Sequence, residues 1–234
     1  MKRFFLFVAI ALATMTAQAQ PKWGTWSIVP HVGVSFSNIS GDKIYAGGFF
    51  SDFDKVSKSK TRIGFSGGLD AVYQATDMLA VSFGAVYTQA GCNFEDVPAN
   101  LSAEHGTVLH DTYYNLGYVD VPLVAHVYVS KGLAFSFGFQ PSFLTNATGH
   151  YEMQDYETNK EGGIKYDKNK VNEENSKNLF KKTAFSIPIG ISYEYENVVL
   201  NAHYNFGLSK VYAYDLGDNK NKIITVSVGY KFNL

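Results

Sequence analysis

Hydrophobic and polar residues alternate along much of this chain. In residues 222–234, apolar side chains occupy one face of the segment and small or polar side chains the other: the apolar ones are Ile224, Val226, Val228, Tyr230, Phe232 and Leu234. An alternation with a period of two is typical of a β-strand that has one apolar and one polar face. The same pattern recurs in residues 26–38, 62–73, 79–88, 118–128, 133–144, 184–195 and 198–209. The sequence therefore predicts eight amphipathic strands.

The connections between these strands alternate in length. Three are short turns, at residues 74–78, 129–132 and 195–197, and four are long and polar, at residues 39–60, about 92–113, 146–182 and 210–221. Of the 41 charged residues, 14 lie between Glu152 and Lys182, seven of each sign, which predicts a solvated loop there. Short turns at one end and long loops at the other are typical of an outer-membrane barrel, with the short turns in the periplasm.

Alternation alone does not say which face of the strands lies inside a barrel. A soluble barrel of the lipocalin type would bury the apolar face and expose the polar one. Here the polar faces are mostly Gly, Ser, Ala and Asn, and small residues suit the narrow interior of an eight-stranded barrel. The apolar faces are almost unbroken Val, Ile, Leu and Phe, as contact with lipid requires. The predicted fold is all-β, an eight-stranded antiparallel up-and-down transmembrane β-barrel.

The ends of the predicted strands support this interpretation. Aromatic residues near them would form girdles at the lipid headgroups: Trp26, Tyr73, Tyr87, Tyr193 and Tyr230. The final strand runs to the last residues, where most chains fray. In a closed barrel this strand must pair with the first, because each unpaired backbone group in hydrocarbon costs several kcal/mol.

The first residues read as a secretory signal peptide. Lys2 and Arg3 precede an apolar run of about ten residues, and small residues at 17–19 offer a cleavage site. The alternative, an uncleaved transmembrane helix, would need about twenty apolar residues. We therefore expect residues 1–19 to be the signal peptide and residues 20–234 to be the barrel domain.

Charge and cysteine content narrow the possible functions. Without Lys2 and Arg3, 18 basic and 21 acidic residues remain, a net charge of −3. The chain has no basic patch of the kind that would indicate binding to nucleic acid. Cys92 is the only cysteine, which excludes an internal disulfide and a metal site built from several cysteines.

Proline falls inside several predicted strands, at Pro30, Pro122, Pro141 and Pro188. Proline has no backbone N–H to donate, so within sheets it is confined to edges and bulges. A closed barrel has no edges. We therefore predict bulges or missing backbone pairs at Pro122 and Pro188.

The inward faces carry ionisable residues. Near the periplasmic end these are His31, Asp70, His126, Glu194, His203 and Lys231, with Asp120 higher in the bore and Arg62 near the outer rim. Because unpaired buried charges are costly, the first interpretation is that these groups neutralise one another. Two alternatives stay open: a His–carboxylate pair acting as the general base of a hydrolase, and zinc binding by the three histidines with carboxylates. No triad or metal-site spacing is recognisable, so the sequence assigns no catalytic, cofactor-binding or metal residue.

Four stretches resemble the PorT-like outer-membrane β-barrel family of Gram-negative bacteria: YVDVPLVAHVYV (118–129), GAVYTQAG (84–91), LNAHYNFGLS (200–209) and VSVGYKF (226–232). The resemblance covers the barrel strands from about Trp26 onward, not the long loops. It implies an eight-stranded barrel in the outer membrane, in a family whose namesake acts in type IX protein secretion and most of whose members have no assigned activity. The chain departs from the common barrel ending, in which the aromatic residue is last, because Asn233 and Leu234 follow Phe232.

Together these observations predict a non-enzymatic outer-membrane protein without a cofactor, exported through a cleaved signal peptide. Its role would be structural, or an interaction through long extracellular loops. The alternatives are a component of a type IX-like secretion or assembly complex, an outer-membrane lipid-modifying enzyme, and a narrow pore. Expected partners are outer-membrane lipids and lipopolysaccharide, the barrel-assembly machinery and, in the first alternative, secretion-complex proteins, but not nucleic acid.

Overall fold

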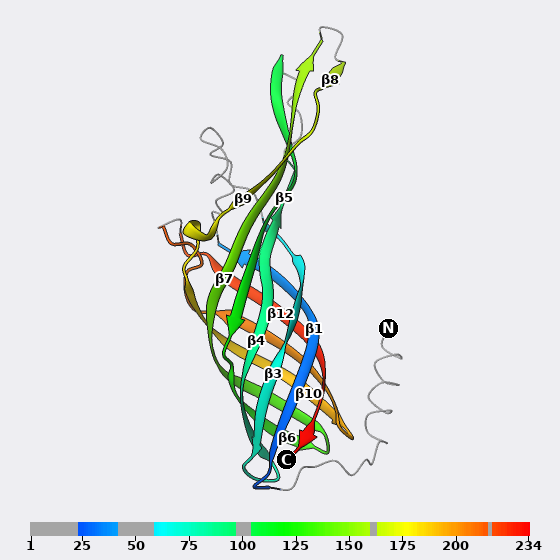
Figure 1. Ribbon diagram of the computed structural model, residues 1–234, viewed down its shortest axis with the longest axis vertical. Coiled ribbons are helices and arrows are strands. Elements are labelled where there is room, and N and C mark those ends of the chain that lie inside the picture. Colours follow the sequence, from blue (N-terminus) through cyan, green and yellow to red (C-terminus); the bar gives the residue numbers. More distant parts are fainter. Residues whose placement is uncertain (1–22, 42–58, 97–103, 160–162, 215–216) are drawn as a thin grey trace.

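The computed structural model describes residues 23–41, 59–96, 104–159, 163–214 and 217–234. Its strands form one antiparallel sheet that closes into a barrel, and some of them run on beyond the barrel at one end (Figure 1). The expected signal peptide, residues 1–19, lies outside the described residues and stays a prediction. No helix among the described residues is long and apolar enough to cross a membrane.

Eight strands form the ring. In chain order they are β1 (Trp26–Ser40), β3 (Arg62–Gln74), β4 (Leu79–Phe94), β5 (His105–Asp120) continued by β6 (Leu123–Ser130), β7 (Leu133–Thr158), β10 (Thr183–Tyr195), β11 (Val198–Gly207) and β12 (Lys220–Tyr230). β5 and β6 act as one strand, because both pair with β4 on one side and with β7 on the other. β12 pairs with β1 and closes the ring. The predicted eight-stranded antiparallel barrel is confirmed.

The backbone pairing is interrupted at prolines, as the sequence predicted. β5 ends at Asp120 and β6 begins at Leu123, so Pro122 lies in a gap between two segments of one strand. Ile187 and Pro188 pair with β11 but have no partners on β7. Since proline has no N–H to donate, a ladder loses a hydrogen bond wherever proline faces the neighbouring strand. The missing pairs predicted at Pro122 and Pro188 are confirmed.

Side chains on the barrel strands alternate between an apolar exterior and a polar interior. On β1, Val34 is exposed and Ser35 is buried, and on β7, Phe137 is exposed and Ser136 is buried. This arrangement is the reverse of a soluble barrel and is the one that a bilayer requires. The predicted orientation of the strands is confirmed, and the lipocalin-type alternative is wrong.

Aromatic residues gather at the end of the barrel that carries the short turns. Trp26 and Tyr73 are cross-strand partners, and their ring centroids are 4.9 Å apart. Tyr193 and Tyr230 lie at the same end, near the ends of β10 and β12. Tyr87 was predicted to lie near a strand end, but it lies in the middle of β4 because that strand is longer than predicted.

At the opposite end the sheet continues well beyond the ring (Figure 1). β7 pairs there with β5 and with two further strands, β8 (Ile164–Tyr166) and β9 (Lys170–Asn175). A short strand, β2 (Ser59–Lys60), pairs with β4, and the 3-10 turn η1 (Lys177–Leu179) follows β9. We call residues 104–112, 148–159 and 163–175 the extension.

The extension corrects two expectations. Residues at about 92–113 and 146–182 were expected to be loops, but most of their described residues belong to strands. The reason lies in their composition: polar residues occupy both faces of these strands, so the period-two signal is lost. Part of the loop expected at residues 39–60 lies outside the described residues, which omit 42–58.

The ring closes between its first and last strands. β12 pairs with β1, and β13 (Phe232–Asn233) continues the ladder to Ser27 and Ile28. The Leu234 N–H also donates to the Trp26 carbonyl at 3.0 Å. The expected pairing of the last strand with the first is confirmed.

Candidate functional site

The bore holds a polar cavity of about 90 Å³ toward the short turns. All six ionisable residues predicted for this end line it: His31, Asp70, His126, Glu194, His203 and Lys231. They come from different strands, and the closed ring brings them together because each faces inward on its own strand. The cavity has room for several water molecules, but it is much smaller than the pockets of about 300–1,000 Å³ that hold drug-sized ligands.

Lys231 and Glu194 form a buried ion pair in this cavity. Lys231 Nζ lies 2.8 Å from Glu194 Oε2, and the two side chains are only 3% and 7% exposed. Tyr128 adds a side-chain hydrogen bond to the same carboxylate. A charge buried this deeply must be paired, because an isolated one costs several kcal/mol. For this pair, the prediction that the inward charges neutralise one another is confirmed.

Two of the histidines that line this cavity, His126 and His203, are each hydrogen-bonded to a serine. Ser82 Oγ lies 2.8 Å from His126 Nε2, and Ser136 Oγ lies 2.9 Å from His203 Nε2. Both histidines were predicted from the sequence but neither serine was, because each serine lies on a different strand from its histidine. A hydroxyl bonded to an imidazole forms the first half of a nucleophile–base–acid triad.

The carboxylate that such a triad needs is engaged elsewhere. Asp70 Oδ2 lies 3.2 Å from His31 Nε2, and within the described part of the chain neither His126 nor His203 has a carboxylate at ion-pair distance. Both pairs also lie inside the bore, away from any lipid or protein substrate. The geometry therefore favours hydrogen bonding over hydrolysis. Among the described bore residues, no three potential metal ligands lie within 4.8 Å of one another, so the geometry gives the zinc alternative for the bore no support.

Asp120 lies in the bore and Arg62 at its rim, as predicted. The Asp120 carboxylate accepts hydrogen bonds from three side chains: Thr88, Gln140 and Ser142. Arg62 Nη1 donates to Asn93 Oδ1 at 3.0 Å, and its guanidinium lies 3.9 Å from the centre of the Tyr113 ring. These two charges therefore have partners of their own.

Apolar side chains fill the other half of the bore, which the sequence analysis did not predict. We call this buried cluster the apolar plug: Ile39, Cys92, Phe94, Tyr114, Leu116, Tyr118, Phe180, Tyr212 and Ile223. Phe180 and Tyr212 come from connections expected to be long and polar, yet each is only 2% exposed, and their ring centroids lie 5.2 Å apart. Single aromatic residues within polar stretches were the only sequence signal for them. The polar side chains that line the cavity form a second layer, which we call the polar layer. Together the apolar plug and the polar layer obstruct the bore, which opposes the pore alternative.

A closed ring of strands with an apolar exterior, a filled bore and aromatic residues at one end defines an integral β-barrel membrane protein. The comparison with protein families agrees, because residues 16–213 match the outer membrane protein beta-barrel domain. The chain belongs to this family, and its location is the outer membrane.

Solved structures of similar fold include three outer-membrane proteins. Ail, the attachment invasion locus protein of Yersinia pestis, is 15% identical, and the match covers 90% of this chain and 100% of Ail with a TM-score of 0.40. Neisserial surface protein A is 14% identical, with 88% and 97% covered and a TM-score of 0.45. OprG from Pseudomonas aeruginosa is 10% identical, with 93% and 99% covered and a TM-score of 0.42. No curated protein matches the chain.

Proposed function

We propose that this protein is a non-enzymatic outer-membrane barrel that presents the extension at the cell surface as an interaction surface. The observation that carries this proposal is the length of β7, which has 26 residues, whereas crossing a membrane takes about 9–11. The bore, in contrast, is obstructed by the apolar plug and the polar layer. In outer-membrane barrels the short turns face the periplasm, so the extension would face the exterior.

Contacts between its strands support a preformed surface. Thr107 Oγ1 on β5 donates to Asp155 Oδ1 on β7 at 2.8 Å, and Lys170 Nζ on β9 lies 3.1 Å from Asp155 Oδ2. One carboxylate thus joins three neighbouring strands. The hydrogen bond from Thr107 and then the charge of Lys170 lower the pKa of Asp155. A surface ordered before binding loses less conformational entropy when a partner docks.

The chemistry of the extension suits a protein partner. Residues 152–159 and 163–175 of the extension carry charges of both signs, six acidic and three basic. Tyr166 and Val171 are exposed among them. Aromatic anchors with a polar, charged surround are typical of protein interfaces, whereas a nucleic-acid surface would carry excess positive charge.

The orientation of the barrel is tested by labelling intact cells with a membrane-impermeant maleimide. Lys165→Cys places a thiol on the extension, and Lys131→Cys places one in a short turn, with both positions exposed. We expect the first to react in intact cells and the second only after the outer membrane is permeabilised. Cys92 is buried and should give little background. Labelling in the reverse order would contradict the proposal.

The role of the extension is tested by shortening it. Met153 and Lys170 are cross-strand partners, so residues 154–169 can be replaced by an Asn-Gly turn, which favours a tight hairpin. We expect this variant to keep the gel shift between unboiled and boiled samples that marks a folded barrel. We also expect it to reproduce the phenotype of a deletion strain. A shortened protein that fully complements the deletion would exclude the distal extension as the interaction surface.

The resemblance to the PorT-like family keeps a role in type IX-like secretion as an alternative, and normal cargo secretion in a deletion strain would oppose it. Under either proposal, lipids and lipopolysaccharide would surround the exterior, and the barrel-assembly machinery would act during insertion.

A further inference from the structure

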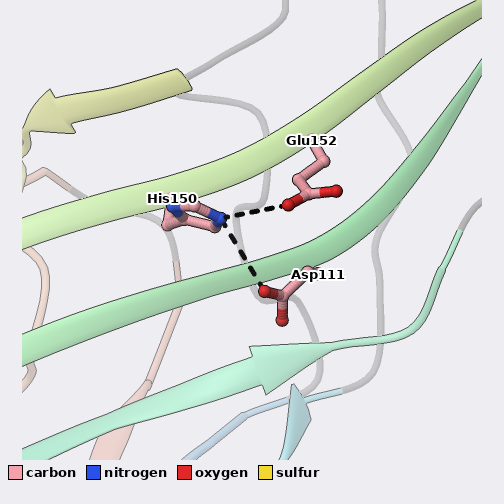
Figure 2. A group of neighbouring side chains, drawn as sticks. All are labelled: Asp111, His150 and Glu152. Atoms are coloured by element: carbon pink, nitrogen blue, oxygen red, sulfur yellow. Dashed lines mark ion pairs between the residues drawn. The ribbon is translucent and has the colours of Figure 1, made fainter. Parts of the chain in front are cut away.

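A His–carboxylate cluster lies in the extension, outside the polar cavity of the bore. Asp111, His150 and Glu152 turn their side chains toward one another (Figure 2). His150 Nε2 lies 3.7 Å from Asp111 Oδ2 and 4.0 Å from Glu152 Oε1. One potential ligand atom from each residue lies within 4.8 Å of the other two. We propose that these three side chains bind one divalent transition-metal ion, of which zinc is the reference case.

The backbone departs from a regular ladder where it completes this cluster. On β7, His150 and Glu152 are two residues apart and share a face. On β5, the register with β7 shifts between His110 and Tyr113, and Asp111 adopts a φ of 44°. A bulge of this kind redirects a side chain, and Asp is among the few residues that tolerate positive φ. The bulge thus brings the Asp111 carboxylate to the His150 ring.

The His150 ring is held in place by packing, and its nitrogen atoms make no hydrogen bond to the described residues. The residue is 9% exposed, and its Nδ1 is buried and has no hydrogen-bond partner. Its ring stacks on Tyr113, with centroids 4.6 Å apart and planes 13° apart. The Nε2 contacts at 3.7 and 4.0 Å are also too long for hydrogen bonds. The orphaned Nδ1 faces Glu173, whereas Nε2 faces the two carboxylates without a hydrogen bond and is therefore available to a ligand.

The distances fit a metal ion between the ligands. Zinc binds imidazole nitrogen at about 2.0–2.1 Å and carboxylate oxygen at about 2.0–2.2 Å. Two atoms bound to one ion therefore lie at most about 4.3 Å apart, which both His150 Nε2 contacts satisfy. Asp111 is exposed and can adjust its carboxylate. A mixed imidazole and carboxylate set favours zinc and similar ions over calcium or magnesium, which prefer oxygen ligands alone.

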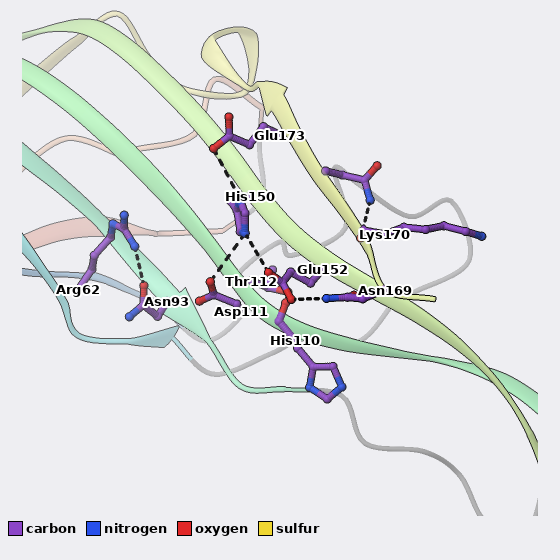
Figure 3. Close-up of polar contacts among 11 residues, drawn as sticks. Arg62, Asn93, His110, Asp111, Thr112, His150, Glu152, Asn169, Lys170 and Glu173 are labelled. Carbon is purple, nitrogen blue, oxygen red and sulfur yellow. Dashed lines mark hydrogen bonds and ion pairs between the residues drawn. The ribbon is translucent and has the colours of Figure 1, made fainter. Parts of the chain in front are cut away.

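Outer contacts orient two of the proposed ligands (Figure 3). Asn169 Nδ2 donates to Glu152 Oε2 at 2.6 Å, which leaves Oε1 directed at His150. Glu173 lies opposite His150 on β9, with its Oε1 3.7 Å from His150 Nδ1. A metal-bound histidine almost always donates its second ring N–H to a carboxylate, carbonyl or water. Glu173 is placed to accept that proton, so a bound ion would tie β5, β7 and β9 together.

The test uses the purified full-length barrel in detergent, freed of metal with a chelator and titrated with zinc chloride alone by calorimetry. We expect one zinc ion per chain. His150→Ala, Asp111→Asn and Glu152→Gln should each weaken binding at least tenfold, and Asn is the matched choice at 111 because it tolerates positive φ. Glu173→Gln should weaken binding about tenfold while leaving one site per chain.

The matched control is His105→Ala, which should bind zinc as the unmodified protein does. His105 Nδ1 lies 3.9 Å from Glu157 Oε1 on the same extension, but both side chains are exposed and they belong to no group of three potential ligands among the described residues. The gel shift on boiling verifies that each variant is folded. If His150→Ala does not fold, Asp111→Asn and Glu152→Gln decide the matter. Absence of saturable binding, or equal affinity in these variants and the control, would overturn the proposal. Because binding is measured in detergent, the result is independent of the proposed surface role.

Discussion

Replacing Lys231 with alanine should lower the free energy of unfolding of the barrel by about 3–5 kcal/mol. The ammonium group of Lys231 lies 2.8 Å from the Glu194 carboxylate, and both side chains are almost fully buried in the bore. Removing the lysine leaves the Glu194 carboxylate, whose side chain is only 7% exposed, without its counter-ion. Urea unfolding in lipid vesicles, followed by tryptophan fluorescence, measures the loss.

Two further variants show whether the loss of stability comes from the broken ion pair or from the removal of a lysine in general. The double change Lys231→Met with Glu194→Gln should recover most of the stability, because no unpaired charge remains in the bore. Lys220→Ala removes the partner of Asp218 from an exposed pair 3.1 Å apart and should cost less than about 1 kcal/mol. If Lys231→Ala were as mild as Lys220→Ala, the interpretation of the bore as a neutralised polar layer would be wrong.

Arginine in place of Val34 should destabilise the barrel by about 2–4 kcal/mol in lipid vesicles. Val34 lies midway along β1 on the outward face and is 41% exposed in the isolated chain. In the membrane this exposed surface would be covered by acyl chains, where a guanidinium loses its hydration. The same unfolding measurement reports the effect.

The matched control for this substitution is Val171→Arg. Val171 is also an exposed valine in a strand, at 60%, but it lies on β9 in the extension. Arginine there should change stability by no more than about 0.5 kcal/mol, as at most surface positions. Equal costs at the two positions would show that the outward face of β1 does not contact lipid.

The barrel itself could be predicted because two different environments act on alternate residues. Lipid selects large apolar side chains such as Val34 and Phe137, and the narrow bore selects small ones such as Ser35 and Ser136. Together they impose a strict period of two. The same rule identified the ionisable residues around the polar cavity, since an inward position on each strand suffices to bring them together.

The extension and the His–carboxylate cluster could not be predicted in this way. Water lies on both faces of much of the extension, so neither face selects apolar residues and the period disappears. The bulge at Asp111 also breaks the simple alternation that would assign its side chain to a face. Phe180 and Tyr212 were missed for another reason: they enter the bore from connections, where strand periodicity does not apply.

The seam between β1 and β12 has a consequence for biogenesis. It joins the portion of the ring that emerges earliest from the ribosome to the portion that emerges latest. Contacts between residues so distant in sequence form slowly. Until they form, the backbone N–H and C=O groups along the edges of β1 and β12 would lack hydrogen-bond partners inside the bilayer. Pairing of β1 with β12 must therefore be a late step that follows the export of β12. Until then, the edge of β1 has to stay bound to a chaperone or in contact with water.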